Sequence, residues 1–176
     1  MIAELGHYAL VLALSVALVQ ATVPLYGAWR GMAGWVGLAR PAAIVQCLLV
    51  MIAFGALTYA YVTSDFSVLN VASNSHSAKP MLYKISGVWG NHEGSLLLWL
   101  LILVLFGGAV ALFGGNLPAP FRARVLAVQA MIAVGFTSFV LFTSNPFVRL
   151  LPAPMDGRGL NPLLQDPGLA FHPPFL

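Results

Sequence analysis

The segment AAIVQCLLVMIAFGALTYAYV, residues 42–62, decides the fold of this chain because it contains no charged residue and no histidine. A helix rises about 1.5 Å per residue, so a helix of this length crosses the roughly 30 Å hydrocarbon layer of a membrane. Pro41 precedes the segment, and proline is favoured at the first position of a helix. Tyr59 and Tyr61, near its end, are residues that suit a membrane interface. The segment therefore predicts a transmembrane helix.

Three further runs, residues 8–26, 95–113 and 125–142, are equally apolar and free of ionisable residues. The whole chain is 60% hydrophobic and only 7% charged, whereas a soluble domain has roughly a quarter of its residues charged. We therefore predict an all-α, polytopic membrane protein with four transmembrane helices. Ion and proton carriers need ionisable groups at depth, so these helices are expected to act as a scaffold.

The beginning of the first run could also be read as a signal peptide. Glu4 and His7 stand where such a peptide would have Lys or Arg, and the run is too long for its apolar region. We therefore interpret it as a membrane helix. The net charge is only +3 with scattered basic residues, so no nucleic-acid partner is indicated.

The polar segments between the runs predict the topology. Four crossings place both termini on one side, together with two long segments, 63–94 and 143–176. The first of these contains SNSHSAKP, residues 73–80, for which we expect neither a buried helix nor a strand. Arginines 30, 40, 122 and 124 mark the short turns, whereas the long segments carry Lys79, Lys84, Arg149 and Arg158. The denser arginines favour the cytoplasm for the short turns, so the long segments are expected to be periplasmic loops.

The last part of the chain, GLNPLLQDPGLAFHPPFL at residues 159–176, shows no helical or strand period and contains four prolines. Each proline fixes φ and removes a backbone donor, so we expect a stiff, irregular tail. His172 lies just before Pro173 and Pro174. A neutral imidazole on a fixed loop suits axial ligation of haem iron, although a lone histidine is more often only a polar residue before a helix. No His/Cys/Glu cluster surrounds it, so a zinc site is not expected.

The segment WGNHEGSLLLW, residues 89–99, has two interpretations. Asn91 or Ser95 can cap the third helix, with Glu93 favourable near its N-terminus. Alternatively, His92 and Glu93 line a polar site beneath the long loops. The two tryptophans that bound the segment are either membrane-interface residues or walls of a cofactor pocket.

Three motifs resemble the CcmF/NrfE family of cytochrome c biogenesis proteins, which are bacterial inner-membrane haem lyases. The motifs are WGNHEGSLLLW at 89–99, FTSNPF at 142–147 and LNPLLQDPGLAFHPP at 160–174, and the similarity extends through ARVLAV at 123–128. The resemblance implies that b-type haem is a substrate, received from the haem chaperone CcmE and attached covalently to apocytochrome c. It also implies a thiol-handling partner, CcmH.

The resemblance further implies that His172 is an outer axial ligand of haem iron, with no catalytic residue assigned. Residues that could form a haem pocket or support one are Trp89, His92, Glu93, Trp99, Pro173 and Pro174. Family members are several times longer, and their tryptophan-rich haem-binding segment would follow residue 176. We therefore expect an N-terminal portion that is inactive alone and needs the remaining C-terminal part. The alternative is a structural or transport subunit of a respiratory membrane complex.

Overall fold

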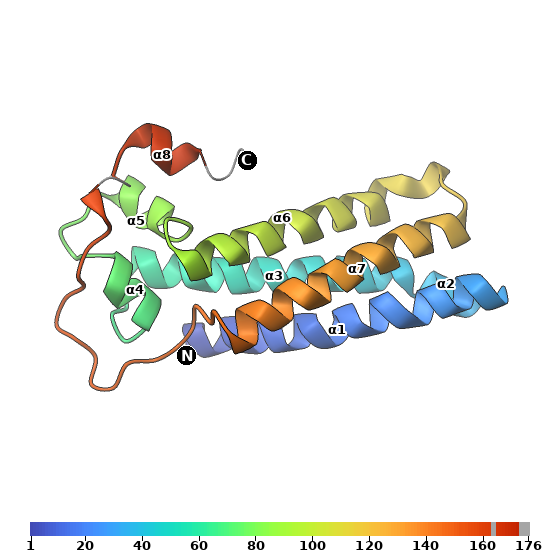
Figure 1. Ribbon diagram of the computed structural model, residues 1–176, viewed down its shortest axis with the longest axis horizontal. Coiled ribbons are helices and arrows are strands. Elements are labelled where there is room, and N and C mark those ends of the chain that lie inside the picture. The colour runs from blue at the N-terminus through green and yellow to red at the C-terminus, as the bar shows by residue number, and fades with distance from the viewer. Residues whose placement is uncertain (163–164, 173–176) are drawn as a thin grey trace.

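Four long helices run side by side in the computed structural model, which describes residues 1–162 and 165–172 (Figure 1). They are α1 (Ile2–Arg30), α3 (Ala39–Val62), α6 (His92–Phe113) and α7 (Ala119–Phe142). Successive long helices run in opposite directions, and all four are long and apolar enough to cross a membrane. The prediction of an all-α protein with four membrane helices is therefore confirmed. Within the described residues, the only β pairing is one isolated bridge.

The long helices extend beyond the apolar runs that predicted them. Helix α1 continues through Pro24 to Arg30, and α7 begins at Ala119, so that Arg122 and Arg124 lie inside the helix. Neighbouring helices can accommodate a proline within a membrane helix. Charged residues are tolerated at helix ends because their long side chains reach the membrane surface. Hydropathy therefore locates the membrane-embedded portion of each helix better than its ends.

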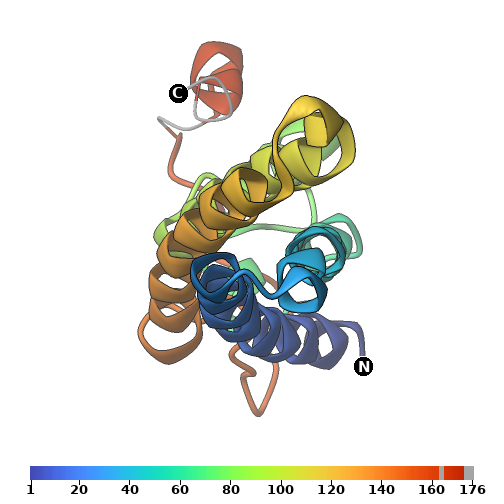
Figure 2. The same cartoon turned by 90° about the vertical axis from the view of Figure 1, so that its right-hand side faces the viewer.

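Small residues allow the helices to pack closely. Helix α1 packs against α3 and α7, and α6 packs against the same two helices, as the view along the bundle shows (Figure 2). The buried positions include Ala9, Ala13 and Ala17 of α1, Ala53, Ala56 and Ala60 of α3, and Ala123, Ala127 and Ala130 of α7. Lipid supplies no hydrophobic force between helices, so association depends on such close backbone approach.

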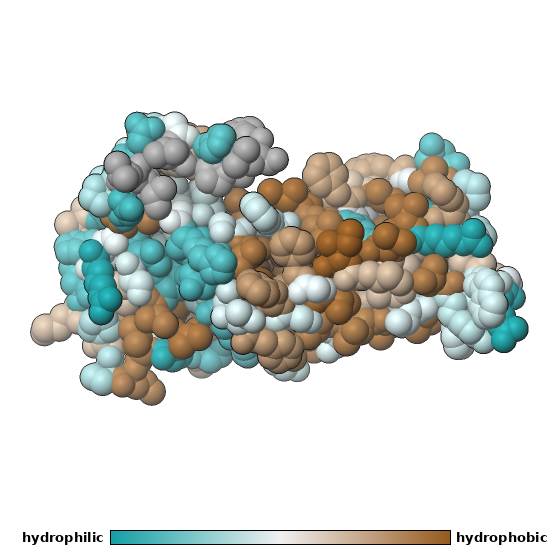
Figure 3. Space-filling model, in the orientation of Figure 1, coloured by the Kyte–Doolittle hydropathy of each residue, from teal (hydrophilic) through white to brown (hydrophobic). Residues whose placement is uncertain are grey.

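Two glutamines link the helices by hydrogen bonds. Gln20 of α1 donates to the Leu126 carbonyl of α7 at 3.1 Å, and Gln129 of α7 donates to the Leu103 carbonyl of α6. Interhelical polar contacts of this kind stabilise membrane bundles. The outer surface of the helices is largely apolar, as the brown surface in Figure 3 shows, with Phe106 as one example of an exposed side chain.

The two long polar segments lie together at one end of the bundle. We call residues 63–91, 143–162 and 165–172 the loop layer. These described residues include three short α-helices, α4 (Leu69–Asn74), α5 (Met81–Gly87) and α8 (Pro167–Phe171). The opposite end, which we call the short-turn end, comprises residues 27–40 and 113–124. It contains α2 (Ala33–Gly37) and the 3-10 turn η1 (Gly114–Asn116).

Two expectations for the loop layer were wrong in part. The segment 73–80 contributes the end of α4 and two buried residues, Ser75 and Lys79. The tail was expected to be irregular, but α8 begins at Pro167. Proline is compatible with a helix start because the first N–H groups of a helix have no intrahelical acceptor.

Candidate functional site

Backbone hydrogen bonds join the two segments of the loop layer. An antiparallel bridge pairs Val68 with Arg149, and the chain after Arg149 then continues beside α4. The bonds run from Leu69 N to Val148 O and from Leu150 N to Ser67 O at 2.8 Å, from Arg158 N to Ala72 O at 2.8 Å, and from Gly159 N to Ser75 O at 3.0 Å. Gly157 is required here, because a Cβ at this position would lie 2.0 Å from the Ser75 carbonyl oxygen. Residues 148–159 are therefore docked on residues 67–75 of the loop layer.

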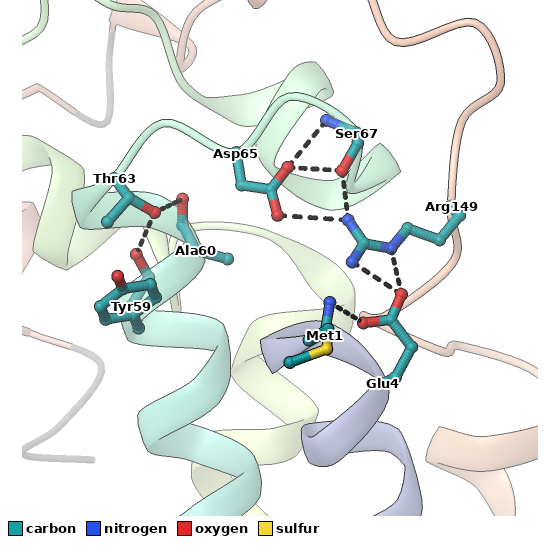
Figure 4. Close-up of polar contacts among 8 residues, drawn as sticks. All are labelled: Met1, Glu4, Tyr59, Ala60, Thr63, Asp65, Ser67 and Arg149. Carbon is teal, nitrogen blue, oxygen red and sulfur yellow. Dashed lines mark hydrogen bonds and ion pairs between the residues drawn. The ribbon is translucent and has the colours of Figure 1, made fainter.

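Arg149 fastens this layer to the bundle (Figure 4). Its Nε and Nη2 atoms each lie 2.7 Å from Glu4 Oε1, and its Nη1 lies 3.2 Å from Asp65 Oδ2. Nη1 also donates to the Ser67 hydroxyl. Burial acts to raise the pKa of Asp65, but hydrogen bonds from Ser67 and Arg149 outweigh this and lower it. The Arg149 guanidinium thus connects the second segment of the loop layer to the start of α1 and to the turn after α3.

A polar network lies beneath the loop layer. Asn91 caps α6, because its Oδ1 accepts the Gly94 N–H at 2.8 Å, and its Nδ2 donates to the Tyr61 hydroxyl at 3.0 Å. Asn70 donates to Asn91 Oδ1 at 2.8 Å and to Glu93 Oε2 at 3.2 Å. The Tyr61 hydroxyl in turn donates to Asn70 Oδ1 at 2.6 Å. The network connects α3, α4 and α6.

This network confirms the helix-start interpretation of residues 89–99, with Asn91 as the cap. Gly94 must be glycine, because a Cβ there would lie 1.6 Å from the Val88 carbonyl oxygen. The interpretation of Tyr61 as an interface residue was wrong, because its side chain is fully buried. A buried phenol needs a hydrogen-bond partner. A search for polar side chains that could accept from the Tyr61 hydroxyl would have included Asn70.

His92 and Glu93 point to different surroundings. Glu93 joins the network, whereas the exposed His92 ring packs edge-on against Phe139 of α7, with ring centroids 6.4 Å apart. Consecutive residues on a helix are separated by about 100°. The structure therefore does not bring these two side chains together in one polar site. Trp99 is exposed on the surface of α6.

Trp89 holds the helix that precedes His172. Its indole N–H donates to the Ala170 carbonyl of α8 at 2.8 Å. The Trp89 ring is half-buried and packs against the main core, and Ala170 is buried beside it. The structure therefore places Trp89 against the helix that precedes His172.

His172 follows the last residue of α8, and its side chain is exposed. Its backbone N–H donates to the Gly168 carbonyl at 3.0 Å, which closes a helical turn. Across the described ranges, 1–162 and 165–172, no hydrogen bond or ring contact of this imidazole is found. Pro173 and Pro174 lie outside the described residues. Within the part of the chain that the structure describes, His172 thus presents an exposed imidazole at the end of a docked helix.

Two other histidines already have partners. Asn145 Nδ2 and His7 Nδ1 lie 3.1 Å apart. His76 Nε2 lies 3.4 Å from Asp156, and its Nδ1 accepts the Ala78 N–H at 3.2 Å. Hydrogen bonds from Ser77 lower the pKa of Asp156 to about 2. His76 is therefore exposed but hydrogen-bonded.

Lys79 is a buried cation within the loop layer. Only 8% of its surface is exposed, and its Nζ donates to the Asn74 carbonyl at 3.0 Å. Burial, with a smaller contribution from the charge of Lys84, lowers the pKa of Lys79 to about 8. Among the described residues, no group of three or more His, Cys, Asp or Glu side chains could hold a metal ion.

Comparisons with known proteins agree on one family. The sequence model described as cytochrome C assembly protein matches residues 89–176. The chain is 68% identical to cytochrome c-type biogenesis protein ccl1 of Rhodobacter capsulatus and 49% identical to CcmF of Escherichia coli, in each case over all of this chain and 27% of the relative. A solved structure named cytochrome c heme lyase CcmF superposes with a TM-score of 0.78 at 29% identity, over 84% of this chain and 25% of that one. The chain thus spans about a quarter of the length of these relatives.

Proposed function

Because the chain belongs to the cytochrome c assembly protein family, we propose that it forms the haem-presenting part of a membrane haem lyase in cytochrome c maturation. The matches confirm the resemblance to CcmF/NrfE proteins that the three sequence motifs indicated. In this proposal, haem is a substrate that passes from the chaperone CcmE to apocytochrome c, with CcmH handling the client thiols. The chain acts together with a C-terminal portion like the one that its relatives possess.

The observation that carries this proposal is the exposed His172 on the docked helix α8. His7 and His76 already engage a ring nitrogen, and His92 lies against Phe139. His172 combines an accessible imidazole with a fixed helix. Both properties favour axial ligation, because iron needs a free ring nitrogen and a defined direction of approach.

We assign supporting roles to two other candidates. Trp89 holds α8 in place through its bond to Ala170, and Glu93 stabilises the network beneath the loop layer. In this proposal neither residue contacts haem. His92 and Trp99 belong to the bundle surface and are not part of the haem site.

We place the loop layer in the periplasm, at the outer face of the inner membrane. The four arginines of the short-turn end support this orientation, because Lys and Arg accumulate in short cytoplasmic turns. A periplasmic loop layer would present His172 to the compartment in which the proposed haem chaperone and apocytochrome meet.

The test compares His172→Ala with His76→Ala in the longer polypeptide, with covalent haem in a co-expressed cytochrome c as the readout. His172→Ala should lose most haem attachment, whereas His76→Ala should retain nearly all of it. Both variants should accumulate in the membrane at wild-type levels. Added imidazole should bind the open iron position in His172→Ala alone. Equal maturation by the two variants would refute the role of His172.

A further inference from the structure

A cavity of about 340 Å³ lies at the short-turn end, opposite the loop layer. It opens where α1 ends and where α3 and α7 begin, on the right of Figure 1. Arg40 and Arg122 line it, together with small and apolar residues such as Ala28, Val36 and Pro120. The cavity therefore combines two cations with apolar walls.

The short-turn end has no carboxylate to balance its arginines. The five acidic residues of the chain are Glu4, Asp65, Glu93, Asp156 and Asp166, and all lie in the loop layer or in the ends of α1 and α6 that meet it. Arg30 stacks over the Trp29 ring, and Arg122 Nη1 donates to the Gly114 carbonyl at 2.9 Å. No hydrogen bond or ion pair of the Arg40 side chain is found among the residues that the structure describes. An anionic ligand would supply the missing charge.

The aromatic residues place this cavity at the level of lipid headgroups. Trp29 and Trp35 are exposed at the same end, and Tyr26 contacts both rings at centroid distances of 6.0 and 5.7 Å. Exposed tryptophan and tyrosine gather where hydrocarbon meets the polar headgroups. Figure 3 shows hydrophilic surface at this end next to the apolar belt. The cavity therefore lies where a phospholipid would present its phosphate.

We propose that Arg40 and Arg122 bind the phosphate of an anionic phospholipid whose headgroup enters this cavity. Guanidinium groups match phosphate oxygens with directed, charge-assisted hydrogen bonds. If the arginines only fixed the orientation of the chain in the membrane, the number of positive charges at this end would matter, and any arginine could supply one. A binding site instead requires these two guanidinium groups. This inference does not depend on the proposed haem function.

The test uses the protein at its natural length, purified in mild detergent, stripped of lipid and studied by native mass spectrometry. Dioleoyl phosphatidylglycerol, the zwitterionic dioleoyl phosphatidylcholine and inorganic phosphate are titrated separately. Phosphatidylglycerol should bind at one molecule per chain and about tenfold more tightly than phosphatidylcholine, because the choline ammonium adds a positive charge beside the arginines. Inorganic phosphate should not displace it.

The matched variants are Arg40→Gln and Arg30→Gln, which remove the same charge from the same end of the bundle. Arg40→Gln should weaken phosphatidylglycerol binding about tenfold, because it removes one guanidinium–phosphate contact. Arg30→Gln should retain wild-type binding. Equal effects of the two variants, equal affinity for the two lipids, or displacement by inorganic phosphate would each overturn the proposal.

Discussion

Replacing Trp89 with phenylalanine tests how the loop layer holds the helix before His172. The change removes the indole N–H that donates to the Ala170 carbonyl at 2.8 Å but keeps an aromatic ring in the core contact. Helix α8 has only five residues and packs on α5. The hydrogen bond from Trp89 to Ala170 therefore supplies a large part of the free energy that holds α8 against the loop layer.

The expected magnitude follows from the buried carbonyl. A net hydrogen bond contributes about 0.5–1.5 kcal/mol, and a buried polar group left without its partner costs about 1–3 kcal/mol. Ala170 is 3% exposed, so water does not readily replace the lost donor. We expect Trp89→Phe to favour undocking of α8 by about 1–2 kcal/mol, which is a factor of roughly 5–30 in the opening equilibrium.

Hydrogen exchange measures this opening directly. The amides of Ala170 and His172 donate to Asp166 and Gly168 within the seated helix. Both should exchange roughly 5–30 times faster in Trp89→Phe, if exchange follows the opening equilibrium. Trp99→Phe is the matched control, because Trp99 is exposed on α6. Unchanged exchange in Trp89→Phe, or equal acceleration in the control, would show that this bond does not seat α8.

Three further predictions concern the topology, the haem-binding capacity of the isolated chain and the buried lysine. Reporter fusions after Asn74 and Asn116 should give periplasmic and cytoplasmic signals, respectively, and a cytoplasmic signal at Asn74 would contradict the proposed orientation. The isolated chain should show no stoichiometric Soret band, because His172 supplies only one axial ligand, whereas the longer polypeptide should show one. A stoichiometric six-coordinate spectrum of the isolated chain would disprove this. The pKa of Lys79 is lowered from 10.5 to about 8. Between these two pH values the unfolded state therefore binds more protons than the folded state, so the free energy of unfolding should rise with pH. Thermal unfolding should show this rise in the wild type and a smaller one in Lys79→Met.

The four membrane helices were predictable because their signal is local. A long run without charged residues can satisfy its backbone within a membrane only as a helix or in a closed barrel. The helix ends were less predictable, because Arg122 and Arg124 fit equally well in a turn or in a first helical turn that reaches the membrane surface. The glutamine contacts between helices depend on helix rotation, which the sequence pattern did not specify.

The site was only partly predictable, because its contacts are long-range. The FHPP motif drew attention to His172, but nothing in the sequence indicates that Trp89 donates to a carbonyl 81 positions away. Tyr61 was misread because the sequence does not show whether its hydroxyl reaches the membrane surface or bonds to a partner inside the protein. Lys79 was counted among the outer charges, and its burial depends on how α4 and α5 meet.

The described attachments of the loop layer differ in kind. Arg149 joins three segments through charged hydrogen bonds, and Asn91 takes part in a network that spans three helices. Among the described residues, helix α8 is held by the Trp89 bond and by packing against α5. Segments with few attachments open locally at lower free energy than the rest of a structure. Loss of the Trp89 bond should therefore release α8 while the amide of Leu150, bonded to Ser67 next to the Arg149 contacts, stays protected. This separation distinguishes local undocking from unfolding of the whole layer.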